Sequence, residues 1–110
     1  MKYVRTKDGI FEVIGERENF VRVKFSGTQG VDIHKEMIKN RSDSIKDLCN
    51  AFVNVEIAGG FEGEFHVYKD LELAKYAADE KVTEIYGAIR TDKGLIYVAK
   101  LNDKGKLELL

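Results

Sequence analysis

Polar and apolar residues follow nearly the same pattern at the two ends of the chain. Residues 4–14 read VRTKDGIFEVI and residues 89–99 read IRTDKGLIYVA. Each segment has a β-rich run, a threonine with a charged pair, a glycine and a second β-rich run, which is the pattern of a β-hairpin. The glycine is needed because the turn requires a residue that adopts positive φ without steric cost. The pattern therefore predicts one hairpin over residues 2–15 and another over residues 82–101.

A third run, from Phe20 to Phe25, alternates with a period of two. Val21, Val23 and Phe25 are expected on one side of a strand, and Arg22 and Lys24 on the other. A loop over residues 26–30 and a short strand over 31–33 follow. Three or four short strands joined by tight turns predict a small antiparallel β-lobe that resembles an SH3-type barrel.

Helical spacing first appears after residue 41. Ile45, Leu48, Cys49 and Phe52 recur at i, i+3, i+4 and i+7, which predicts a helix with one apolar face. Either Ser42 or Ser44 is expected to cap this helix at its N-terminus.

A second helix is predicted over residues 71–79, with Asp70 as its N-cap. Its alanines would let it lie close on a sheet. Strands are expected over 52–57 and 65–68, and the glycine-rich segment 58–64 between them is expected to be a long, flexible hairpin loop.

The order of the expected elements is strands, helix, strands, helix, strands. No strand–helix–strand unit recurs, so the sheets should be mainly antiparallel. We predict an α+β fold with a β-lobe over residues 1–41 and an α+β lobe with two helices over residues 42–110. The two lobes either fold separately or share one core as a single domain. Residues 31–33 and 107–109 are expected to be edge strands open to strand addition.

Composition indicates a small soluble protein. The 110 residues are 44% hydrophobic and 34% charged, with a net charge of −1. No apolar run approaches the length of a membrane span, and no apolar leader follows Met1, so neither membrane association nor secretion is expected. Cys49 is the one cysteine, which excludes an intramolecular disulfide and favours a cytoplasmic protein.

No pattern of catalytic or ligand-binding residues is found. His34 and His66 have no nearby histidine or cysteine partner, so no zinc motif is present. Residues 59–63 lack the lysine of a phosphate-binding loop. Cys49 lies on an apolar face, where burial makes a thiol unreactive. We therefore predict no catalytic, cofactor-binding or metal-binding residues and do not expect an enzyme; a small enzyme is the third hypothesis for function.

Two binding functions fit better. The leading hypothesis is a non-enzymatic protein that contacts a partner protein or a second copy of itself, with candidate interface residues Tyr68, Tyr76 and Tyr86. The alternative is a weak nucleic-acid-binding module. Its candidate basic face consists of Lys2, Arg5, Arg22 and Lys24, in a segment of 41 residues that holds nine basic and six acidic residues.

Three segments carry a resemblance to known sequences: MKYVRTKDGIFEV at residues 1–13, DSIKDLCNAFV at 43–53 and IYGAIRTDKGLIYVAK at 85–100. Together they resemble small proteins encoded by phages and prophages of Gram-positive Firmicutes, a group without an assigned activity. The resemblance implies a setting, namely a phage or prophage accessory gene acting in the bacterial cytoplasm. It implies no functional residues.

Overall fold

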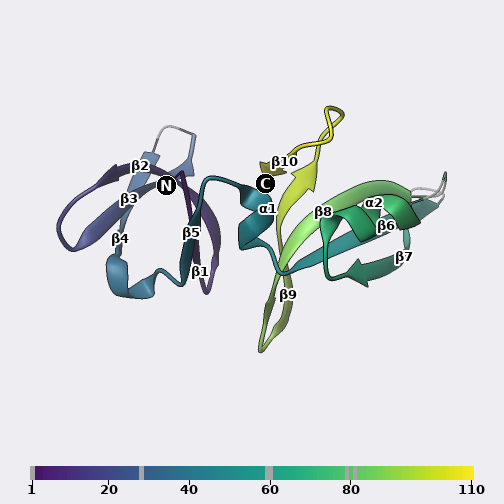
Figure 1. Ribbon diagram of the computed structural model, residues 1–110, viewed down its shortest axis with the longest axis horizontal. Helices are drawn as coiled ribbons and strands as arrows, with labels where there is room; N and C mark the ends of the chain where they lie inside the picture. Colours follow the sequence, from purple (N-terminus) through teal and green to yellow (C-terminus); the bar gives the residue numbers. More distant parts are fainter. Residues whose placement is uncertain (1, 28, 59–60, 79, 81) are drawn as a thin grey trace. The chain divides into compact units, whose positions relative to one another are not determined.

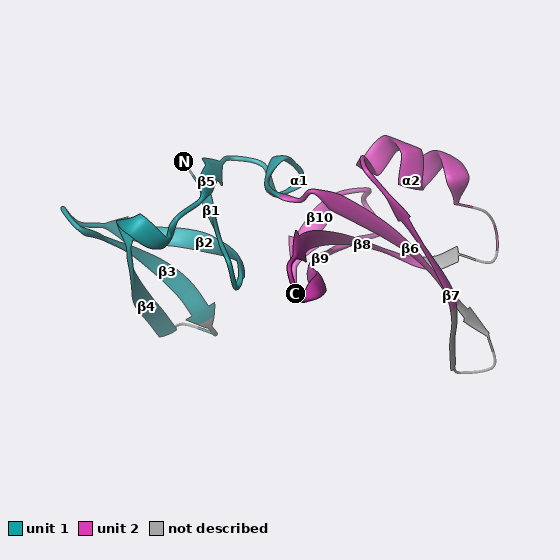
Figure 2. Ribbon diagram, turned by 90° about the horizontal axis from the view of Figure 1, so that it is seen from below, with its two compact units in different colours: residues 1–48 teal, residues 49–110 magenta. Residues whose placement is uncertain are grey.

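The computed structural model describes residues 2–27, 29–58, 61–78, 80 and 82–110 (Figure 1). The chain divides into two compact units, residues 1–48 and 49–110, each built around a five-stranded antiparallel sheet (Figure 2). With two short α-helices and two antiparallel sheets, the fold is α+β, as predicted. The boundary follows Leu48 rather than residue 41. Within the described residues, no helix has the length and apolar character needed to cross a bilayer.

The first unit contains an antiparallel sheet in the order β4-β3-β2-β1-β5. Its core is formed by Val4, Val21 and Val23, while Arg22 and Lys24 are exposed, as the alternation predicted. Phe25 is the exception: the register between β3 and β4 shifts between Lys24 and Ser26, and Phe25 is 66% exposed. The elements are β1 (Tyr3–Thr6), β2 (Gly9–Glu16), β3 (Phe20–Ser26), β4 (Gln29–His34), the 3₁₀ helix η1 (Lys35–Met37), β5 (Asn40–Ser42) and α1 (Ile45–Leu48).

The second unit contains a sheet in the order β10-β9-β8-β6-β7. The helix α2 lies over one face of this sheet, where Phe52, Leu71 and Ala74 form a buried cluster (Figure 2). The buried Asn54 side chain on β6 links the sheet to α2, because its Nδ2 donates a hydrogen bond of 2.9 Å to Ala74 O. The elements are β6 (Ala51–Ala58), β7 (Phe61–Tyr68), α2 (Leu71–Ala77), β8 (Val82–Thr91), β9 (Gly94–Leu101) and β10 (Leu107–Leu109).

The two similar segments fold into matching hairpins. Thr6 pairs with Gly9 and Thr91 with Gly94, so each turn has two residues between its paired ends. In each turn the threonine Oγ1 accepts a hydrogen bond of 3.1 Å from the backbone N–H two residues later. Gly9 and Gly94 have φ values of 150° and 114°, which explains the glycine in both turns.

The first predicted helix is wrong in length. The helix α1 is a single turn, Ile45–Leu48, whereas Cys49 lies outside it and Phe52 belongs to β6. Tertiary hydrogen bonds compete with further helical turns: Arg5 Nη1 donates to Leu48 O at 3.2 Å, and Asn50 N donates to Ala88 O on β8 at 3.1 Å. Ser42 and Ser44 were the two proposed caps. Ser42 is the one whose Oγ accepts a backbone hydrogen bond, from Ser44 N.

The second helix and the glycine-rich segment also differ in extent from the prediction. Asp70 caps α2 as predicted, because its Oδ1 accepts a hydrogen bond from Leu73 N at 2.8 Å. The helix ends at Ala77, however, rather than at residue 79. The expected loop over 58–64 is too long, since β7 begins at Phe61; residues 59–60 lie outside the described residues. The predicted edge strands are confirmed, because β4 and β10 end their sheets.

Candidate functional site

The outward face of α2 exposes two large apolar side chains. Leu71 and Ala74 are buried against the sheet, so the helical repeat turns Leu73 and Tyr76 outward. These residues are 42% and 91% exposed. They lie beside an open depression of about 630 Å³ whose lining residues, called here the α2 surface, are Asp70, Glu72, Leu73, Lys75 and Tyr76.

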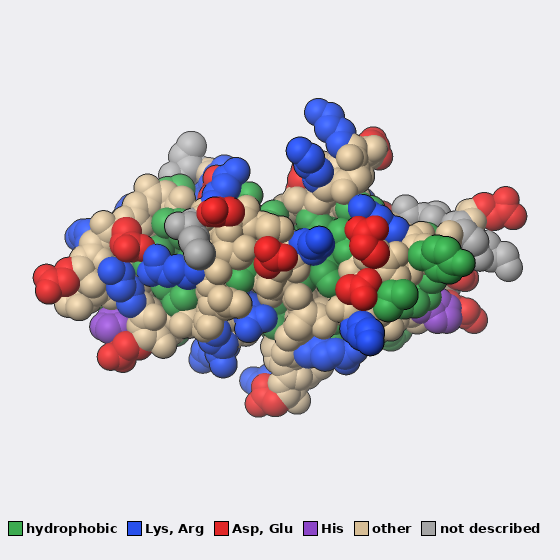
Figure 3. Space-filling model, in the orientation of Figure 1, with side chains coloured by type: hydrophobic (Ala, Val, Ile, Leu, Met, Phe, Trp, Pro, Cys, Tyr) green, Lys and Arg blue, Asp and Glu red, His purple; other side chains and the backbone are tan. Residues whose placement is uncertain are grey.

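Acidic residues surround this apolar pair. Figure 3 shows hydrophobic and acidic side chains next to one another over α2. Asp70 and Glu72 line the same depression as Leu73 and Tyr76. Within the α2 surface, Lys75 Nζ lies 3.9 Å from Glu72 Oε1, so the basic charge there is partly neutralised. Within the α2 surface, Asp70 and Glu72 stand against Lys75, a net charge of −1, so the surface combines an exposed aromatic ring with a small excess of negative charge.

The three candidate interface tyrosines do not come together. Tyr76 belongs to the α2 surface, but Tyr68 is half-buried against the cluster beneath α2. Tyr86 packs on the opposite face of the sheet, with its ring stacked on Tyr97 at a centroid distance of 4.9 Å. Its hydroxyl donates to Glu84, and this hydrogen bond is the main cause that lowers the pKa of the Glu84 carboxyl.

The four candidate basic residues differ in what they contact. Arg5 is half-buried and donates to Leu48 O, so it is part of the fold of the first unit. Arg22 lies along Gly30, where a Cβ would be 2.7 Å from its Nε, and its Nη1 donates to Asp32 at 3.2 Å. Lys2 and Lys24 are exposed. Two of the four are thus engaged by the protein itself.

Ion pairs extend around Arg22 over the surface of the first unit. Asp32 also pairs with Arg17, and Glu16 pairs with Arg41 at 2.5 Å and with Lys35 at 3.5 Å. The hydrogen bond from Arg41 is the main cause that lowers the pKa of Glu16. Acidic partners therefore offset much of the positive charge from which the sequence predicted a nucleic-acid face.

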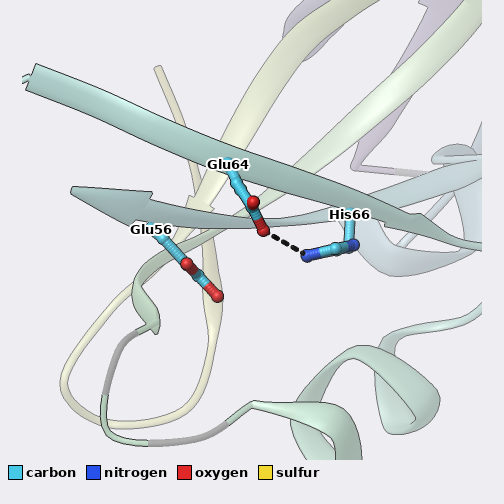
Figure 4. A group of neighbouring side chains, drawn as sticks. All are labelled: Glu56, Glu64 and His66. Atoms are coloured by element: carbon cyan, nitrogen blue, oxygen red, sulfur yellow. Dashed lines mark ion pairs between the residues drawn. The ribbon is translucent and has the colours of Figure 1, made fainter. Parts of the chain in front are cut away.

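A third group of side chains was missed by the sequence analysis. Glu56 on β6 and Glu64 and His66 on β7 converge on one side of the strand pair (Figure 4), and their ligand atoms all lie within 4.8 Å of one another. The prediction of a long loop over 58–64 concealed this group, because a strand is needed to place Glu64 beside its neighbours. The i, i+2 spacing of Glu64 and His66 was the available sequence signal.

Comparison with protein-family models, with curated proteins and with solved structures gave no match.

Proposed function

We propose that the chain is a non-enzymatic accessory protein that binds a partner protein through the α2 surface. The observation that carries the proposal is the pair Leu73 and Tyr76, exposed side by side on a helix whose other face is buried. Tyrosine is enriched at the energetically important positions of protein interfaces, since its ring buries a large apolar area while its hydroxyl keeps a hydrogen bond.

The partner we propose presents a lysine- or arginine-rich segment with an apolar side chain. The apolar side chain would pack on Leu73 and Tyr76, and the basic side chains would face Asp70 and Glu72. The two acidic residues of the α2 surface outnumber its one lysine, which favours such a partner over an acidic one and accelerates their encounter. Binding of this kind weakens as salt screens the charges.

A second part of the proposal concerns the fold of the first unit. The last strand of this unit, β5, follows the 3₁₀ helix η1 and pairs with β1. The sheet therefore has the order β5-β1-β2-β3-β4. We propose that this unit is an SH3-like barrel, since barrels of that type share this strand order. The setting we propose is the one that the sequence resemblance implies, a phage or prophage accessory gene acting in the bacterial cytoplasm.

A pull-down with matched variants tests the proposed function. Tagged wild-type chain is compared with a Leu73→Ser/Tyr76→Ser variant in a nuclease-treated bacterial lysate, and retained proteins are quantified by mass spectrometry. The matched control is Phe25→Ser/Val31→Ser, which removes two exposed apolar side chains from the first unit.

We expect the wild type and the control to retain a protein that has a basic contact segment. The α2 variant should not retain this protein, and high salt should elute it from the wild type. Retention of the same proteins by the α2 variant would contradict the proposal. Recovery of a second copy of the chain would indicate self-association in place of a separate partner protein. The edge strands β4 and β10 are available for such pairing.

Nucleic-acid binding stays a prediction from the sequence. Its structural basis is now the exposed Lys2 and Lys24, because Arg5 and Arg22 are engaged in contacts within the first unit. Nuclease treatment in the pull-down separates this function from a direct protein contact.

A further inference from the structure

We propose that Glu56, Glu64 and His66 form a binding site for one divalent transition-metal ion, for which Zn²⁺ is the best fit. All three side chains project from two hydrogen-bonded strands toward a common point (Figure 4). This site is separate from the α2 surface and does not depend on the proposed function.

The spacing of the donor atoms suits a tetrahedral ion. His66 Nε2 lies 3.5 Å from Glu64 Oε2, and all the ligand atoms lie within 4.8 Å of one another. Ligands about 2.1 Å from a tetrahedral zinc ion are roughly 3.4 Å apart. The observed separation is longer than an ordinary hydrogen bond between nitrogen and oxygen, which is about 2.9 Å. An ion can therefore be accommodated with small side-chain movements.

An irregularity in the strand pair brings the two glutamates together. Val55 pairs with Phe65, but Ile57 pairs with Glu62, so Glu56 lies opposite two residues of β7, Gly63 and Glu64. A bulge of this kind redirects side chains and is frequent near functional sites. Because the ligands lie on paired strands, the backbone ladder restricts their positions before any ion binds.

The ligand chemistry favours zinc over magnesium or calcium. Imidazole is a ligand of zinc and related transition metals, whereas Mg²⁺ and Ca²⁺ prefer shells made of oxygen atoms alone. The two carboxylates supply negative charge to balance the ion. Within the described part of the chain, no lysine or arginine forms an ion pair with Glu56 or Glu64. Three protein ligands leave a fourth position for water.

A buried oxygen beside the cluster provides an independent observation. Asn54 lies directly opposite His66 in the strand ladder and is 1% exposed. Its Nδ2 donates to Ala74 O, but its Oδ1 accepts no hydrogen bond from the described residues. Buried polar atoms of this kind are usually satisfied by a water or an ion. A water molecule bound to the metal would donate a hydrogen bond to Asn54 Oδ1. Hydrogen bonds from neighbouring residues to the ligands are usual in known metal sites.

Calorimetric titration of the full chain with ZnCl₂ near neutral pH tests the site. The titration uses a Cys49→Ser background, so that the thiol cannot bind zinc. We expect one ion per chain, and we expect His66→Ala and Glu64→Gln each to weaken binding roughly tenfold or more, since the first removes a ligand and the second removes the negative charge of one. His34→Ala is the matched control, because it removes the other histidine, which lies at the end of β4. Circular dichroism verifies that the variants are folded.

Specific outcomes would overturn the proposal. These are the absence of zinc binding, equal binding by wild type and His66→Ala, or a loss in His34→Ala as large as that in His66→Ala. Binding of Mg²⁺ or Ca²⁺ as tight as that of Zn²⁺ would also overturn the assignment.

Discussion

Replacing Gly87 by alanine should destabilise the second unit, because the space beside this glycine is occupied by Cys49. A Cβ at position 87 would lie 2.8 Å from Cys49 Sγ, whereas Leu107 Cδ1 and Ala99 Cβ would be at ordinary contact distances of 3.5 and 3.6 Å. The backbone does not oppose the change, since Gly87 is absent from the residues with positive φ. The cost therefore arises from one steric conflict.

The magnitude follows from two opposing effects. Removing a glycine from a strand interior stabilises by about 0.5–1 kcal/mol, because the unfolded chain loses conformational freedom. Inserting a methyl group into a packed core costs about 1–3 kcal/mol. We expect the free energy of unfolding of Gly87→Ala to fall by roughly 1–2 kcal/mol, measured by urea denaturation followed by far-ultraviolet circular dichroism.

Two controls isolate the cause. Gly15→Ala, also in a strand, places its Cβ 3.7 Å from the nearest side chain, so it should be neutral or slightly stabilising. Adding Cys49→Ala to Gly87→Ala removes the conflicting sulfur and should recover about 1 kcal/mol relative to the sum of the single changes. Unchanged or increased stability of Gly87→Ala would refute the close approach of Cys49 to β8.

Three further predictions concern α2, acid stability and nucleic acid. Asp70→Ala removes the cap of α2 and should lower the free energy of unfolding by about 1 kcal/mol in urea denaturation. The lowered pKa of Glu84 makes its ionised form stabilising, so stability should decline as the pH falls below 4.5, and Glu84→Gln should show a shallower decline in acid titrations followed by circular dichroism. The nucleic-acid alternative, which depends on the exposed Lys2 and Lys24, predicts weak oligonucleotide binding that falls steeply with salt in a mobility-shift assay and that Arg22→Glu/Lys24→Glu abolishes. No binding of single- or double-stranded oligonucleotides at low salt would refute that function.

The features that the sequence predicted correctly depend on local interactions. The two hairpins are specified within a few residues by a threonine, a charged pair and a glycine, and both turns form the same threonine hydrogen bond. The cap at Asp70 likewise involves only Leu73 N, three residues away. Local signals of this kind can be recognised without knowledge of the tertiary structure.

The features that the sequence analysis missed depend on residues far apart in the chain. The helix α1 ends after one turn because Leu48 and Asn50 are hydrogen-bonded to Arg5 and Ala88. Neither contact can be inferred from helical spacing, which extended the apolar face to Phe52. The same limit applies to Glu56, Glu64 and His66, since only the pairing of β6 with β7, and its irregular register, brings their side chains together.

The candidate interface residues were also predicted only in part. Tyr76 was identified as an anchor and is 91% exposed, but Tyr68 and Tyr86 were grouped with it although they pack on opposite faces of one sheet. Side-chain burial in a sheet depends on which face the neighbouring elements cover, and the sequence did not show that α2 covers one face only.

Site-specific photo-crosslinking tests the proposed α2 surface most directly. A photoreactive phenylalanine derivative replaces Tyr76 in one sample and the exposed Phe25 of the first unit in another, and both are irradiated in nuclease-treated bacterial lysate. Our account predicts a cross-linked protein specific to position 76, joined through a lysine- or arginine-rich segment and lost at high salt. Cross-links that are absent at position 76, or that are the same at both positions, would contradict it.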